Sequence, residues 1–94
     1  VPNKYINEFL VIRNEIVNLI NRAISIDDAA QIRNDAAKLQ SNLSDYRKRI
    51  IHDIHTKQLN IESMTVFLNL VQESQELLSA LRHTMRGKNK FEEQ

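Results

Sequence analysis

Apolar residues recur at alternating steps of three and four between residues 29 and 50, and no other feature of this chain restricts its fold as strongly. The positions are Ala29, Ile32, Ala36, Leu39, Leu43, Tyr46 and Ile50. This spacing puts them on one narrow seam of an α-helix. The polar residues beside the seam are expected to face solvent, and they are Arg33, Lys38, Gln40, Arg47 and Lys48.

The segment before this seam predicts the start of the helix. Ser25 can cap the helix, and Asp28 follows three residues later as in a capping box. Asp27 and Asp28 would both oppose the positive end of the helix dipole. The sequence therefore predicts a turn near residues 23 to 26.

A second helix is predicted before this turn, with Asn3 as its N-cap. One apolar stripe has helical spacing and comprises Tyr5, Phe9, Ile12, Ile16, Leu19 and Ala23. A second stripe lies beside it and comprises Ile6, Leu10, Val17, Ile20 and Ile24, with Arg13 as its one interruption. Because the apolar arc is about twice as wide as one partner requires, we expect this helix to touch two neighbours.

A third helix is predicted after Asn60, which is a favourable N-cap with Glu62 in the first turn. Its seam comprises Met64, Phe67, Val71, Ser74, Leu78, Leu81 and Met85, and Leu68, Leu70 and Leu77 widen the apolar face. Gly87 can adopt the left-handed conformation that ends a helix. We therefore expect the helix to end there and residues 88 to 94 to form a frayed tail.

The short connections between these segments decide how the helices are arranged. They leave no length for a crossover, so consecutive helices must reverse direction. One Gly and one Pro in 94 residues supply little of the turn chemistry that β-hairpins need. The sequence predicts an all-α fold, an antiparallel up-down-up three-helix bundle over residues 1 to 87, with the middle helix longest at roughly 30 residues.

Composition argues against several classes of function. Thirteen Lys and Arg residues against twelve Asp and Glu give a net charge of +1, which does not favour nucleic acid as a partner. The longest apolar run, Phe9 to Ile12, is far shorter than the roughly 20 residues of a membrane span. The chain has no Cys, no phosphate-binding glycine loop and no nucleophile with a base at motif spacing. We expect no enzymatic activity and no cofactor.

Two residue pairs are candidates for metal binding. His52 and His55 are three residues apart, so both imidazoles can share one side of a helix, although the His-Glu-x-x-His pattern of zinc proteases is absent. Glu73 and Glu76 have the spacing of carboxylates in helical metal sites, without the accompanying histidine. Exposed histidines and solvated surface acids are the alternative interpretation of both pairs.

Three segments carry a resemblance to a known family. They are Asp45 to Arg49, Leu59 to Ser63 and Phe67 to Val71, and residues 45 to 86 resemble the PhoU-like domain at the C-terminal end of sodium/phosphate cotransporter family proteins. That family carries a metal-binding motif in its last helix, an acid followed four residues later by Asp. The matching positions here are Gln72 and Glu76, so the motif is incomplete.

The resemblance implies a function. It implies a regulatory and interaction domain in phosphate uptake, held in the cytoplasm at the inner face of a bacterial membrane by an upstream transport domain. Its expected partners are a second copy and that transport domain. The expected interface residues follow from the apolar pattern instead, as apolar residues in excess of what one small core needs, and they are Leu70, Leu77, Ile20 and Ile24. The alternatives are a free-standing helical adaptor or dimerisation domain unrelated to phosphate, and a metal-binding helical domain.

Overall fold

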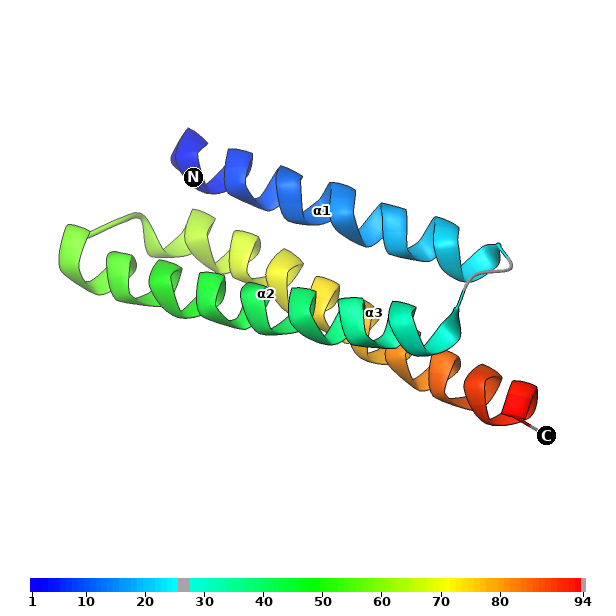
Figure 1. Cartoon of the computed structure of the whole chain (residues 1–94). Coiled ribbons are helices and arrows are strands. Elements are labelled where there is room, and N and C mark those ends of the chain that lie inside the picture. The colour runs from blue at the N-terminus through cyan, green and yellow to red at the C-terminus, as the bar shows by residue number, and fades with distance from the viewer. Residues whose placement is uncertain (26–27, 94) are drawn as a thin grey trace.

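Three helices in up-down-up order make up the regular structure of the described residues (Figure 1). The computed structural model describes the backbone of residues 1–25 and 28–93 and the side chains of residues 1–25 and 28–87. The helices are α1 (Asn3–Ile24), α2 (Ala29–Lys57) and α3 (Ile61–Glu93). They form a rod of 54 × 17 × 17 Å. The expected all-α, antiparallel three-helix bundle is confirmed.

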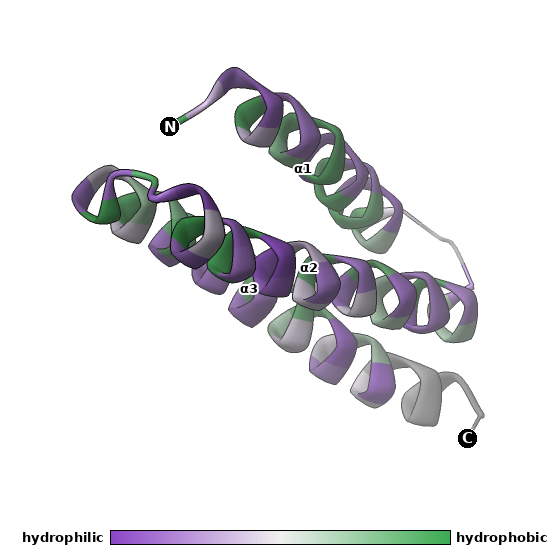
Figure 2. Ribbon diagram, turned by 90° about the vertical axis from the view of Figure 1, so that its left-hand side faces the viewer, coloured by the Kyte–Doolittle hydropathy of each residue, from purple (hydrophilic) through white to green (hydrophobic). Residues whose placement is uncertain are grey.

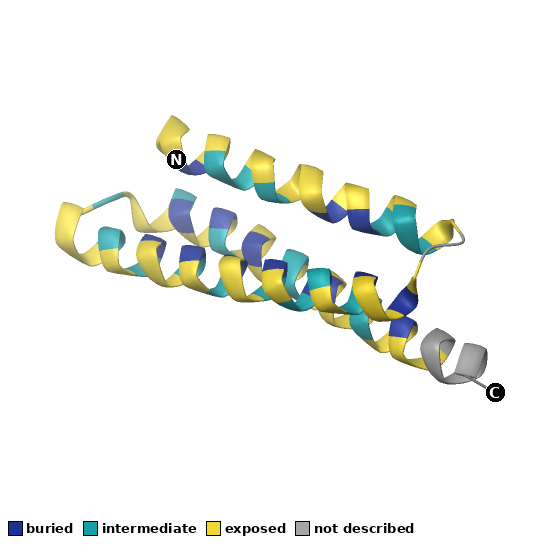
Figure 3. Ribbon diagram, in the orientation of Figure 1, coloured by how far each residue is buried: buried dark blue, intermediate teal, exposed yellow. Residues whose placement is uncertain are grey.

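The core follows the apolar seams (Figure 3). All seven seam residues of α2 are buried, which confirms the narrow face predicted for residues 29 to 50. Ala29 and Ala36 are completely buried, as a close approach of a neighbouring helix requires. From α3 the buried residues are Met64, Phe67, Val71, Leu78 and Met85, and from α1 they are Tyr5, Ile16 and Leu19. The hydrophobic effect acting on these side chains is what brings the three helices together.

Three aromatic rings set the relative positions of the helices. Phe9 of α1 meets Phe67 of α3 edge to face with ring centroids 5.4 Å apart. Tyr46 of α2 meets the same Phe67 ring at 6.4 Å, also edge to face. Such contacts are favourable because the ring edge is positive and the face negative. One ring from each helix therefore fixes the height of each helix along the rod.

Gln40 was expected to face solvent, but its side chain is only partly exposed and contacts α3. Its side-chain amide lies between α2 and α3, where it donates to the Ser79 hydroxyl at 2.6 Å and accepts from the Arg82 guanidinium at 2.7 Å. The buried seam is only one residue away, so the long Gln40 side chain reaches across to α3. Helical spacing alone does not reveal which flanking residues a neighbouring helix covers.

Two of the expected helix starts are wrong and one is confirmed. Asn3 already lies inside α1, because the Pro2 carbonyl accepts the Tyr5 amide at 3.1 Å and begins the helix one residue earlier. Ser25 follows the last residue of α1, and Asp28 instead caps α2 by accepting from the amides of Ala30 and Gln31. The remainder of the expected capping box, Ile26 and Asp27, lies outside the described residues.

The third helix starts as predicted and ends later. Asn60 accepts the Ser63 amide at 3.1 Å, which confirms it as the cap of α3. The helix does not end at Gly87, whose φ is negative, and it continues to Glu93. A glycine inside a helix costs only about 1 kcal/mol, too little to stop it. With 33 residues against 29, α3 rather than α2 is the longest helix.

Candidate functional site

The apolar groove between α1 and α3 is the first candidate site. Its volume is about 350 Å³, and its lining residues are Phe9, Arg13, Ile16, Val17, Ile20, Leu70, Glu73, Ser74 and Leu77. It exists because α1 packs mainly against α2 and touches α3 less extensively. As expected, α1 touches two neighbours, but much of its second apolar stripe stays uncovered.

Exposed apolar side chains extend this groove along both helices. We call the resulting surface the α1/α3 face, and it comprises Ile6, Leu10, Val17, Ile20 and Ile24 of α1 with Val66, Leu70 and Leu77 of α3. Helical spacing places each set on the side of its helix that carries the groove residues. Figure 2 shows the hydrophobic residues distributed along α1. Large exposed apolar patches of this kind typically mark sites of protein contact.

The structure brings three of the four expected interface residues together. Leu70 and Leu77 line the groove and are 48% and 47% exposed, and the half-buried Ile20 lines the same groove from α1. Ile24 belongs to the same stripe but lies at the end of α1, outside the groove lining, with 79% of its surface exposed. Val66 was missed in the sequence, although it lies four residues before Leu70 and therefore on the same side of the helix.

Two opposite charges lie in this groove, whose other lining residues are apolar except for Ser74. Arg13 lines it from α1 and Glu73 lines it from α3, and both side chains are exposed. Within the part of the chain whose side chains are described, neither takes part in an ion pair. The face therefore offers one positive and one negative group to whatever covers it.

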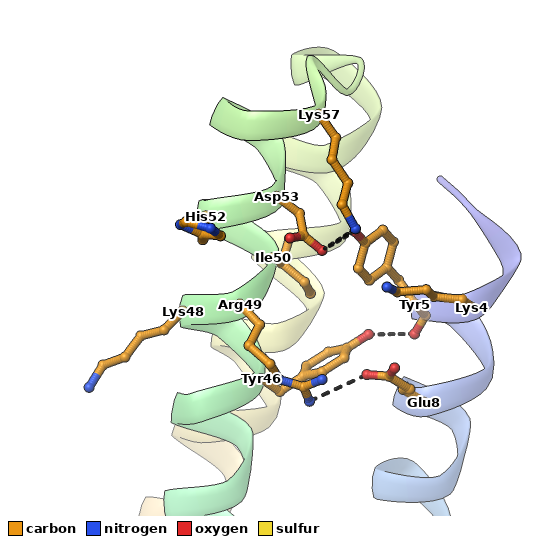
Figure 4. Close-up of a pocket in the computed structure, with 10 residues that line it drawn as sticks. All are labelled: Lys4, Tyr5, Glu8, Tyr46, Lys48, Arg49, Ile50, His52, Asp53 and Lys57. Carbon is orange, nitrogen blue, oxygen red and sulfur yellow. Dashed lines mark hydrogen bonds and ion pairs between the residues drawn. The ribbon is translucent and has the colours of Figure 1, made fainter.

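A polar pocket between α1 and α2 is the second candidate site (Figure 4). Its volume is about 380 Å³, and it is lined by Lys4, Tyr5, Glu8, Tyr46, Lys48, Arg49, Ile50, His52, Asp53 and Lys57. The Tyr5 hydroxyl donates to the Asp53 carboxylate, and the Tyr46 hydroxyl donates to the Tyr5 carbonyl. Lys57 lies 3.5 Å from the same carboxylate. These bonds join the first turns of α1 to the second half of α2.

Protonation in this pocket follows from the hydrogen bonds. The pKa of Tyr5 is raised to about 12, mainly by the hydrogen bond to Asp53 and secondly by burial. The same hydrogen bond lowers the pKa of Asp53. Burial raises the pKa of Tyr46. Both phenols are therefore neutral donors and Asp53 is an ionised acceptor at neutral pH. None of the three is poised for proton transfer near pH 7, and the arrangement holds two helices together.

The basic residues of the pocket are largely occupied. Arg49 lies 3.4 Å from Glu8 and 5.6 Å above the Tyr46 ring, while Lys4 lies 5.3 Å from the Tyr5 ring. Figure 4 shows Lys48 and His52 directed away from α1. The positive groups do not converge on one point, so the pocket is less suited to hold an anion than its composition suggests.

The candidate metal ligands do not form a cluster. His52 lines the polar pocket and His55 is exposed one turn further along α2, while Asp53 between them is bonded to Tyr5. Glu73 lines the α1/α3 groove and Glu76 is exposed. Among the described side chains, no group of three His, Asp or Glu residues comes close enough to hold a metal ion.

Comparison with known proteins leaves the chain without an assigned relative. No protein family, no curated protein and no solved structure matches it. Within residues 1–25 and 28–93, no helix has both the length and the apolar character to cross a membrane. The apolar groove, the polar pocket and the surfaces around them are therefore the basis for proposing a function.

Proposed function

We propose that this chain is a regulatory interaction domain of a sodium-dependent phosphate transporter that acts by helix packing and self-association and catalyses no reaction itself. The observation that carries the interaction role is the α1/α3 face. Its apolar side chains are 37% to 79% exposed in seven positions where the bundle leaves them uncovered, namely Ile6, Leu10, Val17, Ile24, Val66, Leu70 and Leu77. Covering them with another helical surface would remove them from water and favour association.

The assignment to phosphate transport rests on the resemblance of residues 45 to 86 to the PhoU-like domain. The segment 45–49 lies on α2, residues 59–63 span the turn into α3, and residues 67–71 lie on α3. This order of helix, turn and helix is that of the family. In this proposal the domain lies in the cytoplasm and a transport domain upstream of Val1 tethers it to the membrane.

Phosphate uptake by the parent protein tests this proposal. We would replace Leu70 and Leu77 together by Gln, which keeps helix propensity but removes apolar surface. We expect uptake or its response to phosphate to change while the level of the protein stays the same. The control is Val11→Gln, which changes an exposed apolar residue (59%) that belongs to α1 and lies outside the α1/α3 face.

Two results would refute parts of this proposal, the first the regulatory role of the face and the second the transporter assignment. One is uptake that matches the unmodified protein in the Leu70→Gln/Leu77→Gln variant. The other is a coding sequence that has no membrane-spanning segments upstream of Val1. The second result, combined with self-association of the isolated chain, would favour the free-standing adaptor or dimerisation domain instead.

A further inference from the structure

The α1/α3 face has the shape and size of a reversible interface between two helical bundles. From Ile6 to Ile24 it is about 27 Å long at 1.5 Å per residue, and the rod is 17 Å wide. The flat area is therefore roughly 450 Å² per copy and roughly 900 Å² for a pair, which is below the roughly 1,200 Å² of a stable interface and in the range of weak, transient ones. An interface of this size would form and dissociate readily.

The two charges on the face lie at nearly the same height on the rod. The contact between Phe9 and Phe67 places these two residues side by side. Arg13 comes four residues after Phe9, about 6 Å along α1, and Glu73 comes six residues after Phe67, about 9 Å along α3. Because α1 and α3 run in the same direction (Figure 1), the two side chains differ in height by only about 3 Å.

The positions of these charges distinguish between the two symmetric ways of pairing the face. A two-fold axis parallel to the helices keeps each residue at its own height and places α1 opposite α3 of the partner. Arg13 then faces Glu73 of the partner subunit, and the same pair forms a second time by symmetry. A two-fold axis perpendicular to the helices places α1 opposite α1. Since Arg13 lies at the middle of α1 (Asn3–Ile24), full overlap then sets arginine against arginine.

We infer that the occupant of the α1/α3 face is a second copy of this chain, packed in parallel and held in register by Arg13 of each copy against Glu73 of its partner. The inference rests on the proposed function, for which it names the partner and the geometry. The pairing would cover the apolar stripes of both copies and give each unpaired charge its opposite. It also puts both N-termini at one end of the dimer, as attachment to a single membrane face requires.

Reversing one charge in each of two variants, and then mixing the variants, tests this arrangement. We would measure dissociation constants by sedimentation equilibrium for the unmodified chain, for Arg13→Glu and for Glu73→Arg, and then for an equimolar mixture of the two variants. Both substituted residues are exposed, so we expect the variants to fold. Circular dichroism would verify this for each variant. The control is Lys48→Glu, which makes the same change in charge as Arg13→Glu on a side chain directed away from α1.

We expect the unmodified chain and the control to dimerise alike and each reversed variant to dimerise at least about tenfold more weakly, because like charges then meet at the interface. The mixture should recover the original affinity with one copy of each variant per dimer. An ion pair within one chain could not be restored by mixing, so this recovery is specific to contact between copies.

Three results would overturn the inference: an unmodified chain that stays monomeric at several hundred micromolar, reversed variants that dimerise as tightly as the unmodified chain, or a mixture that fails to recover. Unchanged affinity in the reversed variants would point to the perpendicular axis, which already opposes like charges. If Leu70→Gln/Leu77→Gln nevertheless abolished the dimer, the parallel geometry would be wrong while the interaction role of the face would stand.

Discussion

Removing the hydroxyl of Tyr46 tests how much the bond between α1 and α2 contributes to stability. Tyr46 is 1% exposed, and its hydroxyl donates to the Tyr5 carbonyl. That carbonyl also belongs to α1, where the amide four residues later can bond to it. Tyr46→Phe therefore removes one hydrogen bond without leaving a buried acceptor entirely unpaired.

The expected loss follows from this arrangement. A net hydrogen bond contributes about 1 kcal/mol, and the phenyl ring that the Tyr46→Phe variant retains would keep the edge contact with Phe67 at 6.4 Å. For a domain of this size, about 1 kcal/mol lowers the melting temperature by about 4 to 8 °C. Tyr46→Leu also removes the aromatic contact, which is worth about 0.5 to 1.5 kcal/mol more before any cavity is counted.

Urea and thermal unfolding followed by circular dichroism would measure both variants at one fixed protein concentration, because the proposed dimerisation would make stability depend on concentration. An unchanged urea slope would show that the unfolded states are comparable. The reasoning fails if Tyr46→Phe is as stable as the unmodified chain, or if it loses as much as Tyr46→Leu. The first result would mean that the hydroxyl contributes nothing, and the second that the ring contributes nothing.

Three further predictions concern helix ends and pH. Asp28→Ala should lower the free energy of unfolding by about 0.5 to 2 kcal/mol in urea titrations, because the amides of Ala30 and Gln31 lose their acceptor; equal stability would show that the cap is dispensable. Gln58→Gly should raise the melting temperature, because Gln58 has a φ of 51° and a left-handed conformation costs a residue with a Cβ about 1 to 2 kcal/mol. A lower melting temperature would mean that the lost side chain and the greater entropy of the unfolded chain outweigh that cost. The pKa of Tyr5 is raised to about 12 in the folded chain from about 10 when unfolded, so its neutral form stabilises the fold. This contribution to stability is complete below about pH 10 and is lost as the pH rises towards 12. A Tyr5→Phe chain whose stability falls just as steeply over this range would contradict the assignment of this pH dependence to Tyr5.

The pattern of apolar residues determined the helices and most of the core. The seven seam residues of α2 are all buried because a period of three and four residues leaves a helix only one continuous apolar side. Asn60 was correctly expected to cap α3 because its side chain acts on amides within the next turn. Such local interactions depend on neighbours in the sequence, so the sequence is enough to predict them.

The helix ends that failed were decided by competition between local options. Ser25 and Asp28 can both cap α2, and the bonds to Ala30 and Gln31 went to Asp28. Gly87 can end a helix or continue one at a small cost, and α3 continued. At each of these helix ends the two local options differ in free energy by about 1 kcal/mol. Residue type alone does not resolve so small a difference.

The candidate site depended on tertiary structure. Two apolar stripes on residues 5 to 24 showed that α1 had more surface than one neighbour needs. Only the bundle decided that the stripe with Phe9 packs inwards, against both α2 and α3, and that the other stays largely open beside α3. The same is true of the bond between Tyr5 and Asp53, which are 48 residues apart. Helical periodicity describes one helix at a time, whereas the groove, its charges and the tyrosine contacts exist only once packing has set the height and rotation of one helix against another.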